Sequence, residues 1–203
     1  MSAKKHGGPF SDGEWNYVLA YFSDVLHNPF KIFPTHRLIR VPKGKNLNGV
    51  LEKIGTAQKV KDLKTVLSRL EDTREDTPDK GYTFGFYCAK AGFSLFKLNQ
   101  KTVSSVKKNP VDKLDVAVLH KKILEPCFNI RAVESSEAID FTRDAQEAVQ
   151  KVKSGAFDLA VFLRPTSLKE MLLVSKKGLK MPQKSTYFYP KLLTGLVFHG
   201  FED

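Results

Sequence analysis

Apolar and polar positions follow a strand-like pattern in two aromatic, β-branched stretches near the start of the chain. Residues 15–25 predict a strand that is buried on at least one face, and residues 30–41 predict a second strand. Pro34 interrupts the second stretch. Because proline lacks the N–H that a neighbouring strand needs, we expect an edge, a bulge or a kink at this position.

The next two apolar patterns have helical spacing. Residues 46–55 predict a short helix that Gly55 ends, and residues 62–76 predict an amphipathic helix with Asp62 as its N-cap. The apolar stripe of this second helix is Leu63, Val66, Leu67 and Leu70. Residues 71–81 are polar and acidic and contain proline and glycine, so we expect an exposed loop there.

The middle of the chain combines a hairpin pattern with a helical one. Two β-like runs within residues 82–99 predict a hairpin with Gly92 in its turn. Residues 109–128 carry apolar side chains at helical spacing, and we expect Pro126 to end that helix. Residues 128–134 and 138–144 predict further short strands.

The last third of the chain predicts a strand between two capped helices, followed by a final strand. The unbroken apolar run at 157–163 is typical of a strand that is covered on both faces. Residues 184–189 predict the last strand, which Pro190 should end. The two helices begin with pairs in capping-box register and end at glycines, namely Asp144 with Glu147 and Gly155, and Ser167 with Glu170 and Gly178.

The order of these elements indicates the α/β class. Strand, helix and strand in succession predict a parallel pair, whereas the hairpin predicts an antiparallel pair, so we expect a mixed sheet with helices packed against it. Residues 1–13 are expected to form a flexible lead-in. Residues 14–203 are then expected to form mostly one α/β domain, with the 71–81 loop as the place where it could be subdivided.

Charge narrows the choice of partner. The chain has 203 residues and a formal net charge of +11, which favours an anionic partner such as nucleic acid, a nucleotide or a phosphorylated metabolite. Its 26 lysines outnumber its 7 arginines and are scattered, as is typical of a solvated surface. A module that binds nucleic acid or protein through the basic surface is therefore an alternative to a protein that binds a small anionic ligand, and the scattered lysines do not favour it.

Several classes of site are absent from the sequence. No apolar run approaches the roughly 20 residues that span a bilayer, and residues 1–14 lack the apolar core of a signal peptide, so we expect a cytoplasmic protein with no membrane partner. Cys88 and Cys127 lie in apolar patterns and are expected to be buried thiols. The signatures of phosphate loops, dinucleotide-binding loops, zinc proteases and nucleophile elbows are missing, and the five histidines lie far apart. No metal site is predicted, and no catalytic residue can be assigned.

Two histidines raise a question of placement. His36 and Arg37 are adjacent, and a regular strand would direct them to opposite faces, one into the core and one into solvent. Only a distortion at Pro34 would let both act on one ligand.

His120 lies on the helix predicted for residues 109–128, and we interpret it as a histidine that is satisfied at the edge of a helix face.

The stretch "KSTYFYPKLLTGLVF", residues 184–198, groups an ammonium, two hydroxyls and two phenols. If it binds a ligand, Lys184 and a neighbouring hydroxyl would hold an anion while a tyrosine supplies a hydrogen bond or a stacking ring. If it only packs, Tyr187, Phe188 and Tyr189 are aromatic side chains of an amphipathic strand. The residues alone leave both interpretations open.

This stretch, as "MPQKSTYFYPKLLTGLVF", closely resembles the C-terminal signature of the bacterial and archaeal family known as domain of unknown function 1015. The resemblance extends over most of the chain. Further segments that occur in the family's order are "WNYVLAYFSD", "IFPTHRLIRV", "LDVAVLHKKILEPCFNI" and "IDFTRDAQEAVQKVKSGAFDLAVFLRPT".

The chain departs from this family in two places. Family members are longer and carry an Asp-Gly-His-His-Arg-like motif ahead of the first matching strand, which His6, Gly7 and Gly8 do not reproduce. We therefore expect the chain to be the C-terminal part of such a protein or a shortened relative. Arg164 stands where the family usually shows asparagine.

The resemblance also implies a function. The missing motif is similar to one in ParB-like and sulfiredoxin-like proteins, a group that includes nucleotide-dependent kinases of free serine and DNA-partition proteins. It implies phosphoryl transfer to a small hydroxylated metabolite, with ATP or ADP and Mg as cofactors, by a protein of which this chain is an incomplete part. The chain would bind a phosphorylated small molecule or a nucleotide. The implied ligand-positioning residues are His36, Arg37, Lys184, Ser185, Thr186, Tyr187, Tyr189 and Lys191.

Overall fold

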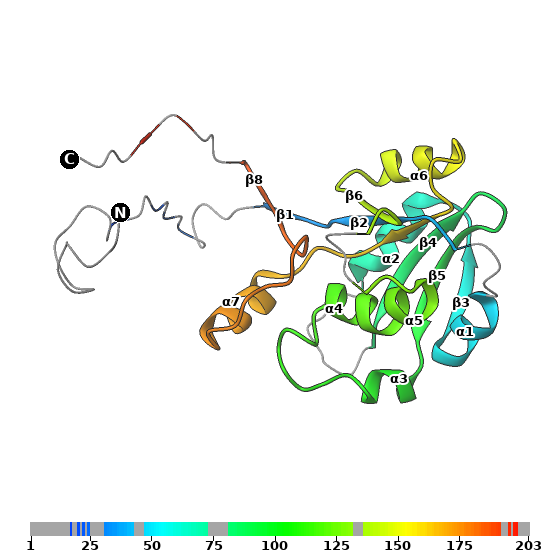
Figure 1. Cartoon of the computed structure of the whole chain (residues 1–203), viewed down its shortest axis with the longest axis horizontal. Coiled ribbons are helices and arrows are strands. Elements are labelled where there is room, and N and C mark those ends of the chain that lie inside the picture. The colour runs from blue at the N-terminus through cyan, green and yellow to red at the C-terminus, as the bar shows by residue number, and fades with distance from the viewer. Residues whose placement is uncertain are drawn as a thin grey trace. The chain divides into compact units, whose positions relative to one another are not determined.

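The structure of the chain is a computed structural model, shown in Figure 1. It describes residues 17, 20, 22, 24, 31–42, 47–72, 81–131, 136–191, 195, 197 and 198. The chain divides into two units, one of Met1–Lys31 with Phe188–Asp203 and one of Ile32–Tyr187, which is called the main unit below. The predicted lead-in, most of the strand predicted for 15–25 and most of the 71–81 loop lie outside the described residues.

The main unit is built on a six-stranded sheet with the strand order β3-β5-β4-β7-β2-β6. Every pair of neighbouring strands in it is antiparallel. The strands are β2 (His36–Ile39), β3 (Gly55–Val60), β4 (Thr83–Cys88), β5 (Gly92–Leu98), β6 (Ile139–Thr142) and β7 (Leu159–Phe162). The α/β class is confirmed, but the predicted mixed sheet is wrong.

The mixed sheet was inferred from a strand, a helix and a strand in succession, and the last strand takes a different partner. After β7 the chain forms α7 (Leu168–Lys176) and then β8 (Tyr187–Tyr189). Strand β8 pairs with β1 (Lys31–Phe33) in a separate two-stranded sheet instead of returning to β7. The sequence pattern predicts a strand over 184–189, of which only Tyr187–Tyr189 is a strand, and it carries no information on which strand edge is free to accept it.

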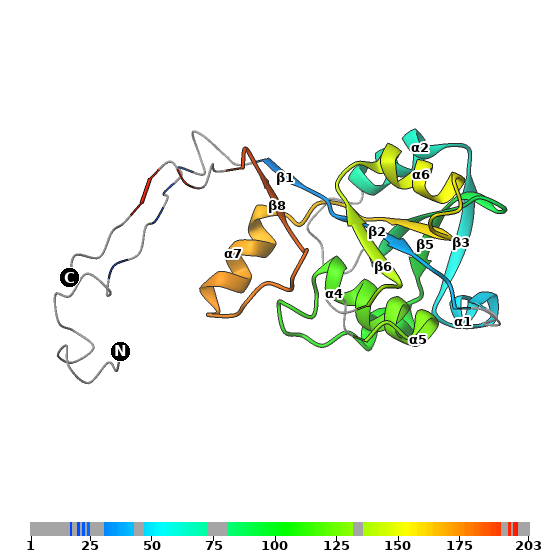
Figure 2. The same cartoon turned by 45° about the horizontal axis from the view of Figure 1, so that its top comes forward.

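Helices cover both faces of the six-stranded sheet (Figure 2). One layer holds α2 (Leu63–Asp72) and α6 (Ala145–Lys153), and the opposite layer holds α4 (Asp115–Leu119), a π-helix (His120–Leu124) and α5 (Glu125–Phe128). The side chains of β7 alternate between the two layers and are all buried. This confirms the predicted coverage on both faces for residues 159–163 of the run at 157–163, whereas Asp158 is exposed.

Local signals in the sequence set several helix ends as predicted. Asp62 accepts a hydrogen bond from the backbone N–H of Thr65 at 2.8 Å and caps α2. Ser167 and Glu170 form the complete capping box of α7. Asp144 caps α6 by accepting from the N–H groups of Gln146 and Glu147, although the side chain of Glu147 turns to Thr142 and Lys151 and does not complete the box. Helices α1 (Leu47–Ile54) and α3 (Gln100–Ser104) complete the main unit.

The local structure differs from the predictions around Pro126, where Phe128 is also helical instead of starting the strand predicted for 128–134, and at β3. Pro126 does not end its helix, because it occupies the first turn of α5, where a missing N–H leaves no helical hydrogen bond unmade. The helix ends instead at Asn129, which adopts the left-handed conformation (φ 59°). Strand β3 was not predicted, because it is an exposed edge strand of mostly polar residues that is defined by backbone pairing with β5.

The sheet and α2 approach each other closely at Gly85, and this contact makes a testable prediction. A Cβ at this position would lie 2.3 Å from Cγ1 of Val66 and 3.1 Å from Cβ of Phe162. Gly85→Ala is therefore expected to lower the free energy of unfolding by about 1–3 kcal/mol, measured by urea denaturation. In a Val66→Ala background the first clash disappears, so the double variant should lose less stability than the sum of the single variants. Additive losses would contradict the close approach.

Candidate functional site

Strand β2 places His36 and Arg37 on opposite faces of the sheet, as the strand pattern predicts. Both side chains are buried, with exposed fractions of 1% for His36 and 4% for Arg37. The expectation that one of them would face solvent is wrong, because β2 lies inside the sheet between β6 and β7 and helices cover both faces. Two ionisable groups therefore have to be accommodated in the interior of the main unit.

The imidazole of His36 is held as a neutral group. Its ring packs edge-on against Phe162, with 5.2 Å between the ring centroids, and its Nδ1 accepts a long hydrogen bond of 3.4 Å from the N–H of Leu163. Burial, and then the adjacent charge of Arg37, lower the pKa of His36 from 6.5 to about 4. At neutral pH the residue is therefore an uncharged part of the core.

The guanidinium of Arg37 remains charged in the interior. Burial lowers its pKa from 12.5 to about 10, still well above neutral pH. The group donates to the backbone carbonyls of Thr35 and Lys184, the latter at 3.0 Å, and lies over the ring of Phe141 at 5.3 Å. Among the described residues, no carboxylate forms an ion pair with it. Arg37 is thus a buried cation that is solvated by carbonyl dipoles and a ring instead of a counter-charge.

A cavity of about 270 Å³ adjoins Arg37 on the side of the sheet that α4 covers. Its polar lining includes His120, Arg131 and Gln183, together with Lys121 and Asp112, which form an ion pair with each other. The apolar part of the lining comes from Val111, Val116, Ala117, Leu124 and Pro182. Because Asp112 is paired with Lys121, the cavity keeps an excess of positive charge from Arg37 and Arg131.

His120 lies in this cavity wall, at the first residue of the π-helix. Its Nδ1 is buried and makes no hydrogen bond in the part of the chain that the structure describes. The interpretation of His120 as a satisfied histidine is therefore wrong for this nitrogen. The π-helix itself was not predicted, and such a turn is often associated with functional sites.

Lys184 and Ser185 begin the stretch of residues 184–198, called the terminal motif below, and they contact the rest of the main unit largely through their backbone. Lys184 has a left-handed conformation (φ 53°) and presents its carbonyl to Arg37. Ser185 is buried, donates its hydroxyl to the carbonyl of Pro182 at 2.6 Å, and accepts from Thr166 through its own carbonyl at 3.0 Å. These contacts hold residues 182–185 beside the cavity.

The remaining residues of the motif are dispersed. The phenol of Tyr187 is a hydrogen-bond partner of Arg143, whose guanidinium also lies 4.7 Å from the centre of its ring. Thr186 is half-buried, and the side chain of Lys184 is exposed. Tyr189 and Lys191 belong to the unit of Met1–Lys31 with Phe188–Asp203. Of the eight residues proposed from the sequence, the structure brings Arg37, Lys184 and Ser185 together and places Arg37 in the cavity wall. Their binding of a ligand stays a prediction.

An ion-pair network at the end of β7 was missed by the sequence analysis. Arg164 pairs with Asp115 through two contacts, 2.6 Å from Nε and 3.1 Å from Nη2, and lies 3.5 Å from Glu170. Burial raises the pKa of Asp115 even though Arg164 opposes the shift, and burial beside Asp115 raises the pKa of Tyr82 to about 12. The network joins the start of α4 to the start of α7. The resemblance singles out Arg164, but nothing in the sequence indicates that Asp115 and Glu170 are its partners.

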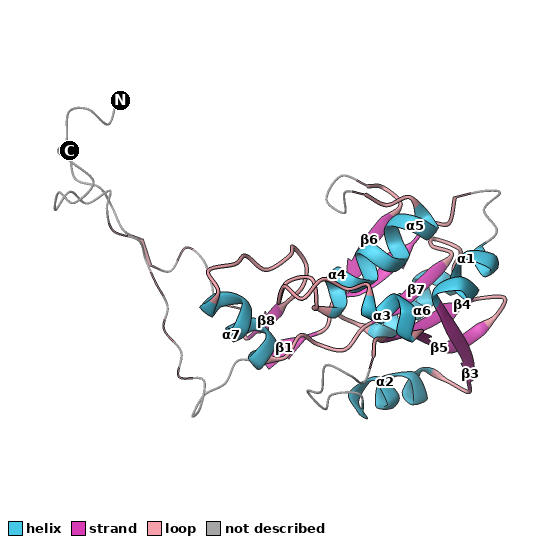
Figure 3. Ribbon diagram, turned by 90° about the horizontal axis from the view of Figure 1, so that it is seen from below, coloured by secondary structure: helices cyan, strands magenta, loops and turns pink. Residues whose placement is uncertain are grey.

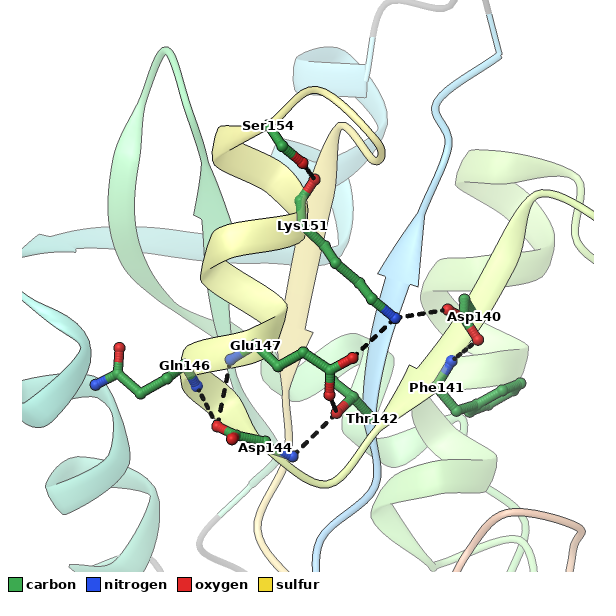
Figure 4. A network of polar contacts seen from close by, with 8 residues as sticks. All are labelled: Asp140, Phe141, Thr142, Asp144, Gln146, Glu147, Lys151 and Ser154. Atoms are coloured by element: carbon green, nitrogen blue, oxygen red, sulfur yellow. Dashed lines mark hydrogen bonds and ion pairs between the residues drawn. The ribbon is translucent and has the colours of Figure 1, made fainter.

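A second polar network fastens β6 to α6 (Figure 4). Lys151 bridges Asp140 at 3.2 Å and Glu147 at 2.9 Å, and Glu147 accepts from the hydroxyl of Thr142. The contacts of Lys151 to Glu147 and Asp140 raise the pKa of Lys151. The hydrogen bonds from Thr142 and Lys151 lower the pKa of Glu147. The network fixes the strand that carries Phe141 beside β2 and thereby supports the ring under Arg37.

Other classes of site have little support in the described residues. Both cysteines are free thiols, and Cys127 is buried whereas Cys88 is half-buried, so the predicted burial holds fully for Cys127 alone. Among the residues that the structure describes, no group of three or more His, Cys, Asp or Glu could hold a metal ion. Within the same part of the chain, no helix is long and apolar enough to cross a membrane.

Fold and site together define a main unit with an antiparallel sheet, helices on both faces and a basic cavity against a buried arginine. The chain belongs to the family described as protein of unknown function (DUF1015), whose model matches residues 1–117. The terminal motif on which the resemblance was partly based lies beyond the matched residues. No curated protein matches the chain.

Solved structures to which the chain is similar include free serine kinase in complex with AMP, with a TM-score of 0.46 and 11% identity over 82% of this chain and 56% of that chain. A conserved hypothetical protein from Pyrococcus furiosus matches with a TM-score of 0.44 and 11% identity over 82% of this chain and 59% of that chain. A mutant of free serine kinase in complex with ADP gives a TM-score of 0.42 at 10% identity over 82% and 56%. The chain thus spans little more than half the length of these proteins.

The buried neutral state of His36 predicts a pH dependence of stability. The unfolded chain binds a proton on this residue near pH 6.5, whereas the folded chain does so only near pH 4. The free energy of unfolding should therefore fall as the pH decreases from 6.5 to 4, by up to about 3 kcal/mol from this group. Urea denaturation across this range should show a smaller fall for His36→Asn. Because carboxylates titrate equally in both proteins, parallel pH profiles would contradict the assignment.

Proposed function

We propose that the chain binds a small phosphorylated molecule, or a nucleotide through its phosphate, in the cavity beside Arg37. The observation that carries this proposal is the buried guanidinium, which has no ion-pair partner among the described residues. An isolated charge in the protein interior is costly unless an opposite charge approaches it. A phosphate bound in the cavity would supply that charge.

The other groups in the cavity wall suit the same ligand. Arg131 adds a second guanidinium, a group whose planar donors match phosphate oxygens. Gln183 and His120 add groups that can hydrogen-bond to a hydroxyl or an amine of the ligand. A volume of about 270 Å³ is near the lower end of the usual range for ligand pockets, so a nucleotide would extend beyond it.

The terminal motif has two roles in this proposal. Lys184 and Ser185 would position Arg37, since the carbonyl of Lys184 accepts from the guanidinium and Ser185 fixes the neighbouring backbone. His36 would support β2 from the opposite face as a neutral core residue. The side chains of Lys184 and Thr186 are proposed to approach the ligand directly, and the ligand contacts predicted for Tyr187, Tyr189 and Lys191 stay predictions.

Calorimetric titration with ATP, ADP and phosphoserine tests the binding site. We expect saturable heat at millimolar concentration for at least one of these ligands, and an affinity roughly tenfold lower or worse for Arg37→Met, because the variant removes the central charge. Arg40→Met is the matched control: this exposed arginine at the end of β2 lies 4.9 Å from the ring of Phe157 and is not part of the cavity wall. Circular dichroism should confirm that both variants fold.

Three outcomes would overturn the proposal. These are an absence of heat for all three ligands, an equal loss of affinity in the two arginine variants, and unchanged binding by a folded Arg37→Met variant. Arg131→Gln provides a second test at an exposed position if Arg37→Met does not fold. DNA affinity that falls steeply with salt would instead support the alternative of a nucleic-acid-binding module on the basic surface.

We further propose that this binding chain is the C-terminal part of a nucleotide-dependent phosphotransferase that acts on a small hydroxylated metabolite. Phosphoryl transfer is catalysed mainly by positioning and charge stabilisation, for which arginine, lysine and hydroxyl groups are suited. Among the described residues, the cavity wall contains two arginines and a lysine. We expect the chain alone to bind ligand. Incubated with serine, Mg and either ATP or ADP, it should form no phosphoserine that mass spectrometry can detect. Turnover by the chain alone would contradict its proposed incompleteness.

A further inference from the structure

Helix α7 carries an apolar surface that nothing in the described part of the main unit covers. The main unit has three exposed large apolar side chains among its described residues, and all three lie in α7 or the turn that follows it: Leu172 (40% exposed), Leu173 (49%) and Leu179 (37%). Elsewhere in the described main unit, large apolar side chains are buried or half-buried. Single exposed leucines are ordinary, but this concentration within eight consecutive residues is not.

The attachment of α7 explains why these leucines are left uncovered. Val174 is its buried anchor in the core, and the capping box with the Arg164 contact fixes its first turn. In all three whole-chain views, α7 lies beside the sheet and not over either face (Figure 3). The sheet therefore cannot bury the side of the helix that carries the leucines.

The C-terminal turn of α7 adds Leu179 to this surface. The N–H of Leu179 donates to the carbonyl of Val174 at 3.1 Å, and the N–H of Gly178 donates to the carbonyl of Ser175 at 2.8 Å. This pair of hydrogen bonds is the Schellman motif, in which the chain reverses at a left-handed glycine, here Gly178 with a φ of 64°. Leu179 is thereby held close to the last turn of the helix.

Lysines are interleaved with the leucines. Lys176 follows Leu172 by four residues and Leu173 by three, so on the helix surface it is a neighbour of both. Lys177 and Lys180 are exposed at the end of the same surface. The carboxylate of Glu170 is used in the cap and in the Arg164 contact, so it does not neutralise these ammonium groups.

We propose that this face of α7 and its turn, the α7 surface, docks an amphipathic protein segment whose leucine-sized side chains are flanked by carboxylates. Apolar side chains of the partner would cover Leu172, Leu173 and Leu179, while its carboxylates pair with Lys176 and Lys177. A second copy of the chain is a poor occupant, because each copy carries a net charge of +11. The proposal is independent of the ligand cavity.

The positions of the lysines favour a protein partner over an anionic membrane. A helix that lies in a membrane surface keeps its lysines on a polar face away from the inserted apolar side chains. Here Lys176 lies between Leu172 and Leu173, so insertion of both leucines would carry an ammonium group toward the acyl chains, which is costly. A protein groove can place a carboxylate opposite that ammonium group.

The test uses a defined probe on the full chain. A synthetic amphipathic helix with leucines on one face and glutamates beside them is titrated by fluorescence anisotropy, and a peptide with lysines in place of the glutamates is the control. We expect saturable binding of the acidic peptide and none of the basic one. Leu172→Gln with Leu173→Gln should weaken binding by roughly tenfold or more, without a change in melting temperature, because both side chains are exposed.

Charge reversal provides the second arm of the test. Lys176→Glu with Lys177→Glu should reverse the preference, so that the basic peptide binds better than the acidic one. Vesicles of phosphatidylcholine with phosphatidylserine should not bind the chain through Leu172 and Leu173. Equal affinity for the two peptides, no binding of the acidic peptide, or vesicle binding that the leucine substitutions abolish would each overturn the proposal.

Discussion

Coverage of β2 on both faces is the constraint on which the rest of the main unit depends. Every residue of β2 is buried, although the strand contains a histidine and an arginine. An interior position forces each of these groups into one defined state, because an unsatisfied charge or polar atom is costly there. His36 becomes neutral beside Phe162, whereas Arg37 stays charged and takes its contacts from carbonyl oxygens and the ring of Phe141.

The need to satisfy Arg37 explains the position of residues 182–185. The carbonyl of Lys184 reaches the guanidinium from 147 residues further along the chain, and Ser185 and Thr166 hold that backbone in place. Arg164 meanwhile pairs with Asp115 of α4 and with Glu170 of α7. Helix α4, which borders the cavity, and helix α7, which carries the exposed leucines, are therefore held by the same arginine. Neither network is local in sequence, and both act on the same side of the sheet.

Local patterns predicted a large part of the described secondary structure. The interruption at Pro34, the caps at Asp62, Asp144 and Ser167, and the hairpin around Gly92 depend on neighbouring residues and were predicted correctly. The polar edge strand β3 and the π-helix had no such signal. In the candidate site, Arg37 was predicted to contact a ligand, but its neighbours His120, Arg131 and Gln183 were not, because their proximity arises only when distant segments pack together.

The sequence by itself determined the α/β class, most helix ends, the burial of residues 159–163 and the basic character of the chain, since these depend on composition and on spacing within a few residues. Tertiary structure decided the antiparallel arrangement, the partner of the last strand, and the burial of both His36 and Arg37. It also decided that Asp112 is neutralised by Lys121 while Arg37 has no counter-charge among the described residues. The physical reason is that strand pairing and charge compensation depend on which distant groups come within a few ångströms, and no pattern along one segment encodes that distance.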